Sequence, residues 1–108
     1  AVILALSGIL VATTAKAFEN RIVTVIDSGA GQRLVVDLAQ LDYVSSSGLR
    51  VFLLAAKRLQ ATNGNITLCG LQDQIRQVFD LSGFSSIISI YGSRDEAIEG
   101  LSTLAPSQ

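Results

Sequence analysis

The chain has 108 residues, a length that suits one domain, and 49% of them are hydrophobic while 16% are charged. This composition excludes intrinsic disorder, which requires low hydrophobicity and high charge. Eight Lys and Arg against nine Asp and Glu give a net charge of -1, so the basic excess typical of nucleic-acid-binding domains is absent. We expect residues 1–108 to form one domain.

Residues 1–12 predict a buried strand that runs into a loop. They are apolar except for Ser7, rich in Val and Ile, and interrupted at Gly8. The alternative is a remnant of a signal peptide, but no positively charged segment precedes the apolar stretch. The stretch is also too short to cross a bilayer as a helix, which takes about 20 residues.

Residues 13–28 predict a helix, because their apolar residues recur at spacings of three and four: Ala15, Phe18, Ile22, Val25 and Ile26. The β-branched run over 22–26 argues for a strand instead. Gly29 and Gly31 supply a helix stop, however, and a continuous apolar run over 34–38 follows as the next strand. Residues 39–44 are expected to form a loop.

A second helix is expected to open within Ser45-Ser46-Ser47-Gly48 and to end at Asn63-Gly64. Its predicted buried stripe consists of Leu49, Phe52, Leu53, Ala56 and Leu59. Residues 66–69 then predict a strand whose side chains alternate between the two faces of a sheet.

The last third of the chain continues the alternation. A third helix is predicted to stop at Gly83 and to carry Leu71, Ile75, Val78 and Phe79. Residues 87–90 predict the last strand, and Ser93 followed by Glu96 is the capping-box pattern of a fourth helix. The inward residues of that helix are expected to be Ala97, Ile98 and Leu101. Residues 104–108 are expected to be a frayed tail.

This alternation predicts an α/β fold with a mainly parallel or mixed sheet of about four strands and about four helices. In open α/β sheets, functional sites lie beyond the carboxyl ends of strands, where loops lead into helix N-termini. Three consecutive serines, Ser45 to Ser47, occupy such a position. One interpretation is that a serine caps the helix. The other is that a serine accepts a phosphoryl group, whose charge is favoured at a helix N-terminus.

The residue types exclude several other kinds of site. Histidine is absent, which removes Ser-His-Asp catalysis and histidine-ligated metal sites. The one cysteine, Cys69, permits no intramolecular disulfide and is typical of a small core residue. This cysteine usage fits a reducing compartment, and we expect a cytoplasmic protein without cofactor, metal, nucleic acid or membrane insertion.

Residues 34–38 form an apolar strand that contains Asp37-Leu38, and residues 41–51 read Leu-Asp-Tyr-Val-Ser-Ser-Ser-Gly-Leu-Arg-Val. Together these segments resemble the centre of STAS domains, which occur in sulfate transporters and anti-sigma factor antagonists. Four other short segments are similar to the family in register, so that the resemblance covers nearly the whole chain: Gly8 to Leu10, Thr14 with Phe18, Val78 to Phe84, and Asp95 to Ile98.

The resemblance implies a small bacterial regulatory domain without catalytic activity. An anti-sigma factor antagonist binds a serine-kinase anti-sigma factor and thereby frees a sigma factor, which regulates transcription. The kinase phosphorylates the antagonist on a serine at a helix start, and this breaks the complex. A metal-dependent serine phosphatase restores it.

Residue by residue, the family's acidic position falls on Ser45 and its phosphoacceptor on Ser46. The resemblance therefore implies phosphorylation of Ser46, with Asp37 and Asp42 in supporting positions. It also implies a partner-binding surface made of Thr13, Thr14, Ser45, Ser46, Ser47, Gly48, Leu49 and Arg50.

Two segments differ from the family pattern. The family's Gly-Glu-Leu-Asp stands here as Gly8-Ile9-Leu10-Val11. We expect the family's first strand to have no counterpart in residues 1–108, since Ala1 aligns with the start of its second strand. We therefore expect an apolar edge without a pairing partner over Val2 to Leu6, and concentration-dependent homodimers, because open strand edges promote association.

Two other functions stay open. In one, the domain is a scaffolding or transporter-associated STAS module in which Ser46 only helps to start a helix. In the other, Asp37 and Asp42 beside the serines form a small phosphoryl-transfer enzyme, although two carboxylates make a poor metal site.

Overall fold

The computed structural model describes residues 2–29 and 33–104, and the side chains of residues 2–29 and 33–100. Strands and helices alternate along the chain, with one short 3-10 helix, η1. Their order is β1 (Val2–Leu10), α1 (Ala12–Asp27), β2 (Arg33–Val44), α2 (Ser46–Ala61), β3 (Asn65–Cys69), α3 (Asp73–Leu81), η1 (Phe84–Ser86), β4 (Ser89–Tyr91) and α4 (Arg94–Leu104). None of the helices in these ranges combines the length and apolar character needed to cross a membrane.

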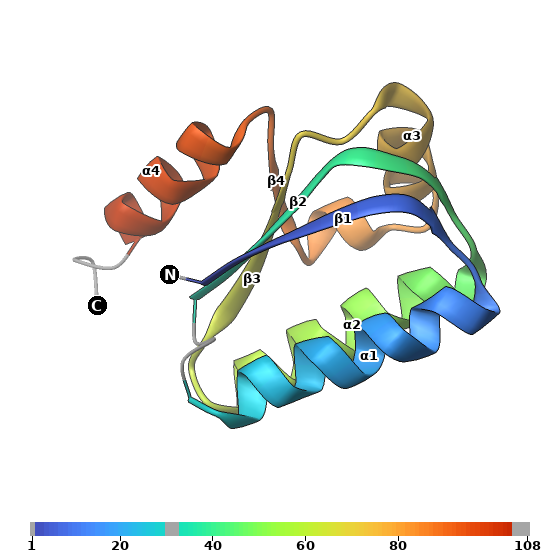
Figure 1. The fold of residues 1–108 in the computed structure, drawn as a ribbon. Helices are drawn as coiled ribbons and strands as arrows, with labels where there is room; N and C mark the ends of the chain where they lie inside the picture. The colour runs from blue at the N-terminus through green and yellow to red at the C-terminus, as the bar shows by residue number, and fades with distance from the viewer. Residues whose placement is uncertain (1, 30–32, 105–108) are drawn as a thin grey trace.

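The four strands form one sheet in the order β1-β2-β3-β4, and each neighbouring pair is parallel. Helices α1 and α2 lie side by side on one face of the sheet, and α4 lies on the opposite side (Figure 1). The predicted α/β class and parallel sheet are confirmed. Parallel strands require covered faces, which explains why the 34–38 segment is a continuous apolar run.

The main core fills the space between the sheet and helices α1, α2 and α3. A chain of aromatic rings runs through it: Phe18 contacts Phe52 at 5.3 Å between ring centroids, Phe52 contacts Phe79 at 5.4 Å, and Phe79 contacts Phe84 at 5.9 Å. These separations are typical of favourable ring pairs. The rings connect α1, α2, α3 and η1, so that α2 and its first turn have a fixed place on the sheet.

The second strand is longer than the sequence predicts, and the loop expected over 39–44 is wrong. β2 continues to Val44 and pairs with β1 along its length, with register shifts between Ala5 and Ser7 and between Gly8 and Ile9. In this part the buried residues, Leu38, Leu41 and Val44, are three apart. A spacing of three does not match the two-residue period of a strand, so the sequence pattern alone does not predict one here.

Smaller corrections concern the later elements. Residues 66–69 were expected to alternate, but all four are buried, because α4 covers one face of β3 and α2 the other. β4 begins at Ser89 rather than at 87, since η1 precedes it and leaves Ile87 exposed. In α2 the buried residues include Val51 and Ala55, whereas Leu49, Leu53 and Ala56 are half-buried.

The ends of two helices also differ from expectation. α3 begins at Asp73, so Leu71 lies before the helix, and it is only half-buried. In α4, Ala97 is buried as predicted, but Ile98 is 37% exposed. Leu104 belongs to α4 rather than to a tail, while the side chain of Leu101 and residues 105–108 lie outside the described part. Ser93 caps α4 as predicted, because its Oγ accepts the N–H of Glu96 at 3.2 Å.

Candidate functional site

The start of α2 is attached directly to the carboxyl ends of β1 and β2. The N–H of Ser45 donates a 2.8 Å hydrogen bond to the carbonyl oxygen of Leu10. A Cβ at Gly48 would lie 2.8 Å from Cγ2 of Val44 and 2.9 Å from Cδ2 of Leu10. Both distances are shorter than van der Waals contact, so the first turn of α2 can approach the strand ends only because residue 48 is glycine.

The structure distinguishes the three serines. Ser45 is the N-cap of α2: its Oγ accepts the N–H of Gly48 at 3.4 Å, and its carbonyl oxygen accepts the N–H of Leu49 at 3.0 Å. Ser46 is the first helical residue and is exposed, and its hydroxyl makes no hydrogen bond to the described residues. Capping and phosphate acceptance therefore do not compete for one hydroxyl.

The electrostatics of this helix start favour an added negative charge. The first turn of α2 contains no acidic residue, and a helix N-terminus carries a partial positive charge from its unpaired N–H groups. Arg50 lies one turn beyond Ser46 and is exposed. It is not part of the ion pairs found among the described residues, so its guanidinium is available to an anion.

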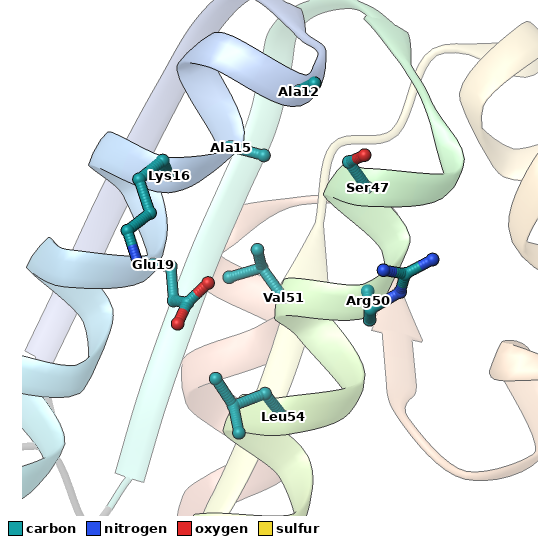
Figure 2. Close-up of a pocket in the computed structure, with 8 residues that line it drawn as sticks. All are labelled: Ala12, Ala15, Lys16, Glu19, Ser47, Arg50, Val51 and Leu54. Carbon is teal, nitrogen blue, oxygen red and sulfur yellow. The ribbon is translucent and has the colours of Figure 1, made fainter.

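A groove of about 330 Å³ separates the first turns of α1 and α2 next to the serines. Figure 2 shows Glu19 reaching from α1 towards Val51 of α2, with Ser47 in the first turn of α2 above Val51. Ala12 and Ala15 line it on the α1 side, and their small side chains keep it open.

The predicted partner-binding residues from α1 lie at the same end of the sheet. The Oγ1 of Thr14 accepts the N–H of Val11 at 2.8 Å and donates to the carbonyl oxygen of Ile9 at 2.9 Å. Thr14 thus holds the junction between β1 and α1, while Thr13 is exposed beside it. The first turns of α1 and α2 lie at the same end of the fold (Figure 1), and these turns carry Thr13, Thr14 and residues 46–50.

The two supporting carboxylates face other parts of the fold. Oδ2 of Asp37 forms an ion pair with Arg94 of α4 at 2.9 Å, and its Oδ1 accepts the N–H of Ala39 at 3.0 Å. Oδ1 of Asp42 accepts Nε2 of Gln72 at 3.1 Å. Both carboxylates thus attach neighbouring elements to β2. No cluster of three or more metal-ligating side chains occurs in the described part of the chain.

Cys69 is buried against Val35 and Ala97, on the face of the sheet that α4 covers. Burial raises the pKa of its thiol, the nearby charge of Asp37 raises it further, and Arg94 opposes these effects in part. A thiol held in its neutral form is a poor nucleophile. This placement agrees with the core position predicted for Cys69.

Sequence reasoning missed one feature of this end of the molecule. Ile9 and Tyr43 are paired across β1 and β2, and they are 52% and 54% exposed. Tyr43 fell within the supposed loop, and Ile9 read as one more residue of a buried strand. One feature of the sequence could have indicated this exposure: Ile9 and Val11 occupy the positions at which the STAS pattern Gly-Glu-Leu-Asp has its two acidic residues.

Comparison with known proteins agrees with the resemblance to STAS domains. A protein-family model described as "STAS domain" matches residues 1–97. A protein of Bordetella bronchiseptica whose name describes an anti-sigma factor antagonist, BtrV, is 41% identical over 101 residues, which cover 94% of this chain and 86% of that protein.

Two solved structures share the fold. One is the phosphorylated form of the Bacillus cell fate determinant SpoIIAA, with a TM-score of 0.72, 25% identity, and coverage of 92% of this chain and 88% of that chain. The other is the STAS domain of a SulP transporter from Vibrio cholerae, with a TM-score of 0.76, 15% identity, and coverage of 99% and 84%. At 15% identity, the second likeness concerns the fold alone.

Proposed function

The chain belongs to the STAS domain family, and on this premise we propose that it is an anti-sigma factor antagonist controlled by phosphorylation of Ser46. In its unphosphorylated form it binds a serine-kinase anti-sigma factor and so releases a sigma factor. It acts by binding and not by catalysis. The kinase transfers phosphate to Ser46 and ends the interaction, and a metal-dependent serine phosphatase reverses the modification in the cytoplasm.

The observation that carries this proposal is the state of the Ser46 hydroxyl. It is exposed, it makes no hydrogen bond to the described residues, and it stands at the start of a helix whose cap is a different serine. A kinase can therefore reach Ser46 Oγ without unwinding α2 or breaking a bond that the fold needs. The resemblance supports the same choice, because the phosphoacceptor position of the resembled pattern falls on Ser46.

The proposed switch depends on two opposite effects of one phosphate. Phosphoserine carries about -1.5 to -2 charges at pH 7. Within the free chain these charges lie at the positive end of α2 and one turn from Arg50, where they are tolerated or stabilising. Beneath a bound partner the same charges must lose their water, which is costly where no opposite charge meets them. Phosphorylation therefore weakens binding while the fold is kept.

The proposal is tested by incubating the chain with ATP and Mg²⁺, alone and with each purified serine-kinase anti-sigma factor of the source organism. Sites are mapped by fragmentation mass spectrometry in the wild type, Ser46→Ala and Ser47→Ala. Ser47 is the matched control, because it is the neighbouring serine in the same turn and is not the cap. We expect label on Ser46 only when a kinase is present, its loss in Ser46→Ala, and its retention in Ser47→Ala.

Other outcomes point to the alternatives. Phosphate chiefly on Ser45 or Ser47 would show that the assignment of the acceptor is wrong. No label with any of the kinases would contradict the proposal and favour a scaffolding or transporter-associated STAS module. Turnover of ATP by the chain alone would indicate an enzyme.

A further inference from the structure

Ile9 and Tyr43 form an exposed apolar pair close to Ser46. They are partners in the parallel pairing of β1 with β2, so their side chains stand next to each other on one face of the sheet. Their neighbours Leu10 and Val44 are buried in the core on the other face. The pair therefore lies outside the core, and more than half of each residue is accessible to a partner.

The two chain segments that carry the pair contain very little charge, although Arg21 lines a hollow together with Ile9 and Arg50 is exposed on α2. Residues 6–14 contain no Asp, Glu, Lys or Arg, and residues 38–49 contain one charged residue, Asp42. Oδ1 of Asp42 already accepts a hydrogen bond from Gln72. The part of a partner that lies directly over the two side chains must be apolar or uncharged, since a charge buried against them would lack an opposite charge.

A protein that covers Ser46 can also reach this pair. Three peptide units separate Tyr43 from Ser46, so their Cα atoms lie within about 11 Å of each other, and Ile9 is one strand spacing, about 4.8 Å, further. A specific interface of standard size covers about 800 Å² of each partner, which corresponds to a roughly circular patch about 16 Å in radius. The Cα atoms of Ile9 and Tyr43 therefore lie within reach of a patch of this size centred on Ser46.

We infer that Ile9 and Tyr43 are the apolar anchor through which this chain binds its serine-kinase anti-sigma factor, and that the kinase presents an uncharged depression to the Tyr43 ring. The inference rests on the proposed function and adds the chemistry of the contact. Aromatic residues near the centre of an interface contribute much of the binding energy, whereas charges at its rim mainly change the association rate. The affinity therefore depends on the ring and changes little with salt.

The experiment uses the kinase that labels Ser46 fastest, with ADP in place of ATP so that no phosphate is transferred. Its affinity for the wild type is compared by calorimetry with that for Ile9→Ser, Tyr43→Ser, Tyr43→Phe and Ile87→Ser. Ile87→Ser is the matched control for Ile9→Ser, because Ile87 is 59% exposed and lies between η1 and β4, outside the surface around Ser46. Tyr43→Phe keeps the ring and removes only the hydroxyl.

We expect Ile9→Ser and Tyr43→Ser each to weaken binding at least about tenfold, or roughly 1.4 kcal/mol. Tyr43→Phe and Ile87→Ser should bind like the wild type. All four variants should melt close to the wild type, since the altered side chains are exposed. Wild-type affinity should fall little between low and high NaCl concentrations, whereas an interface held by ion pairs would weaken steeply.

Wild-type binding by both Ile9→Ser and Tyr43→Ser, with Ser46 still labelled by the kinase, would overturn the anchor and leave the phosphorylation switch standing. Failure of every kinase to label Ser46 would overturn the proposed function and the anchor together. Loss of self-association in both variants, with unchanged kinase affinity, would assign the pair to an interface between two copies of this chain and contradict the inference.

Discussion

The carbonyl oxygen of Leu10 accepts a 2.8 Å hydrogen bond from the N–H of Ser45, which ties the last residue of β1 to the cap of α2. The bond joins two segments that are 35 residues apart in the sequence. Because of it, Ser46 follows directly from a strand end that is fixed to the sheet. A partner therefore meets a preformed surface, which lowers the cost of ordering on binding.

Ser45 and Ser46 should differ in their effects on stability. Ser45→Ala removes the side-chain cap of α2 and should lower the free energy of unfolding by about 1 kcal/mol. Ser46→Ala removes an exposed hydroxyl that makes no hydrogen bond to the described residues, and it should change stability by less than about 0.5 kcal/mol. Urea unfolding of the two variants measures this. Equal losses, or a larger loss for Ser46→Ala, would contradict the assignment of the cap.

Gly48→Ala should destabilise the chain by about 1–3 kcal/mol, because the new methyl group overlaps Leu10 and Val44 in the core. Gly92→Ala is a suitable control. A Cβ at Gly92 also meets an atom at 2.8 Å, but this atom is Oε1 at the flexible end of Glu96, which can move away. Thermal melts of both variants should show a clear loss for Gly48→Ala and a small one for Gly92→Ala. Similar melting temperatures would mean that α2 shifts freely on the strand ends.

The thiol of Cys69 should make stability fall in alkaline solution. Its pKa is raised in the folded chain, so the unfolded chain loses this proton at a lower pH than the folded chain does. The contribution is fully present below the ordinary thiol pKa and is lost as the pH rises towards the folded one. Urea unfolding between pH 7 and about pH 10 should show a steeper decline for the wild type than for Cys69→Ala. Parallel curves would show that burial does not affect this thiol.

The outer edge of β1 pairs with no strand among the described residues, and Ile3 and Ala5 are exposed near it. Open strand edges promote pairing with a second copy. We expect the 108-residue chain to form dimers as its concentration rises, and Ala5→Lys to suppress them. Analytical ultracentrifugation of both proteins is the measurement. A wild type that stays monomeric over a wide concentration range would contradict this expectation.

Much of the fold was predictable because several apolar residues in each element follow the period of the same secondary structure. In α1, Ala15, Phe18, Ile22 and Ile26 follow the helical period and are all buried, so this period correctly outweighed the β-branched run over 22–26. The carboxyl part of β2 was not predictable. Its bulges give Leu38, Leu41 and Val44 a spacing of three, and only the pairing with β1, far away in the sequence, makes it a strand.

The candidate site also has features that the sequence predicts and features that it does not. The residue pattern correctly predicted a helix start within Ser45 to Gly48, because α2 begins at Ser46. Which serine caps α2 could not be decided, because three serines in a row have the same capping preference and only the backbone geometry separates them. The exposure of Ile9 and Tyr43 was also beyond sequence reasoning, since an apolar residue in a strand is normally assigned to a core.

Phosphate on Ser46 is expected to abolish binding to the kinase without unfolding the chain. The most direct test compares the affinities of the unphosphorylated and the Ser46-phosphorylated chain for the same ADP-bound kinase, with a thermal melt of each form. We predict that phosphorylation weakens binding at least about tenfold, while the phosphorylated form melts at or above the temperature of the unmodified one. Ser46→Asp should likewise weaken binding and melt at or above the temperature of the unmodified chain. Equal affinities of the two forms would contradict the account, and so would unfolding of the phosphorylated chain.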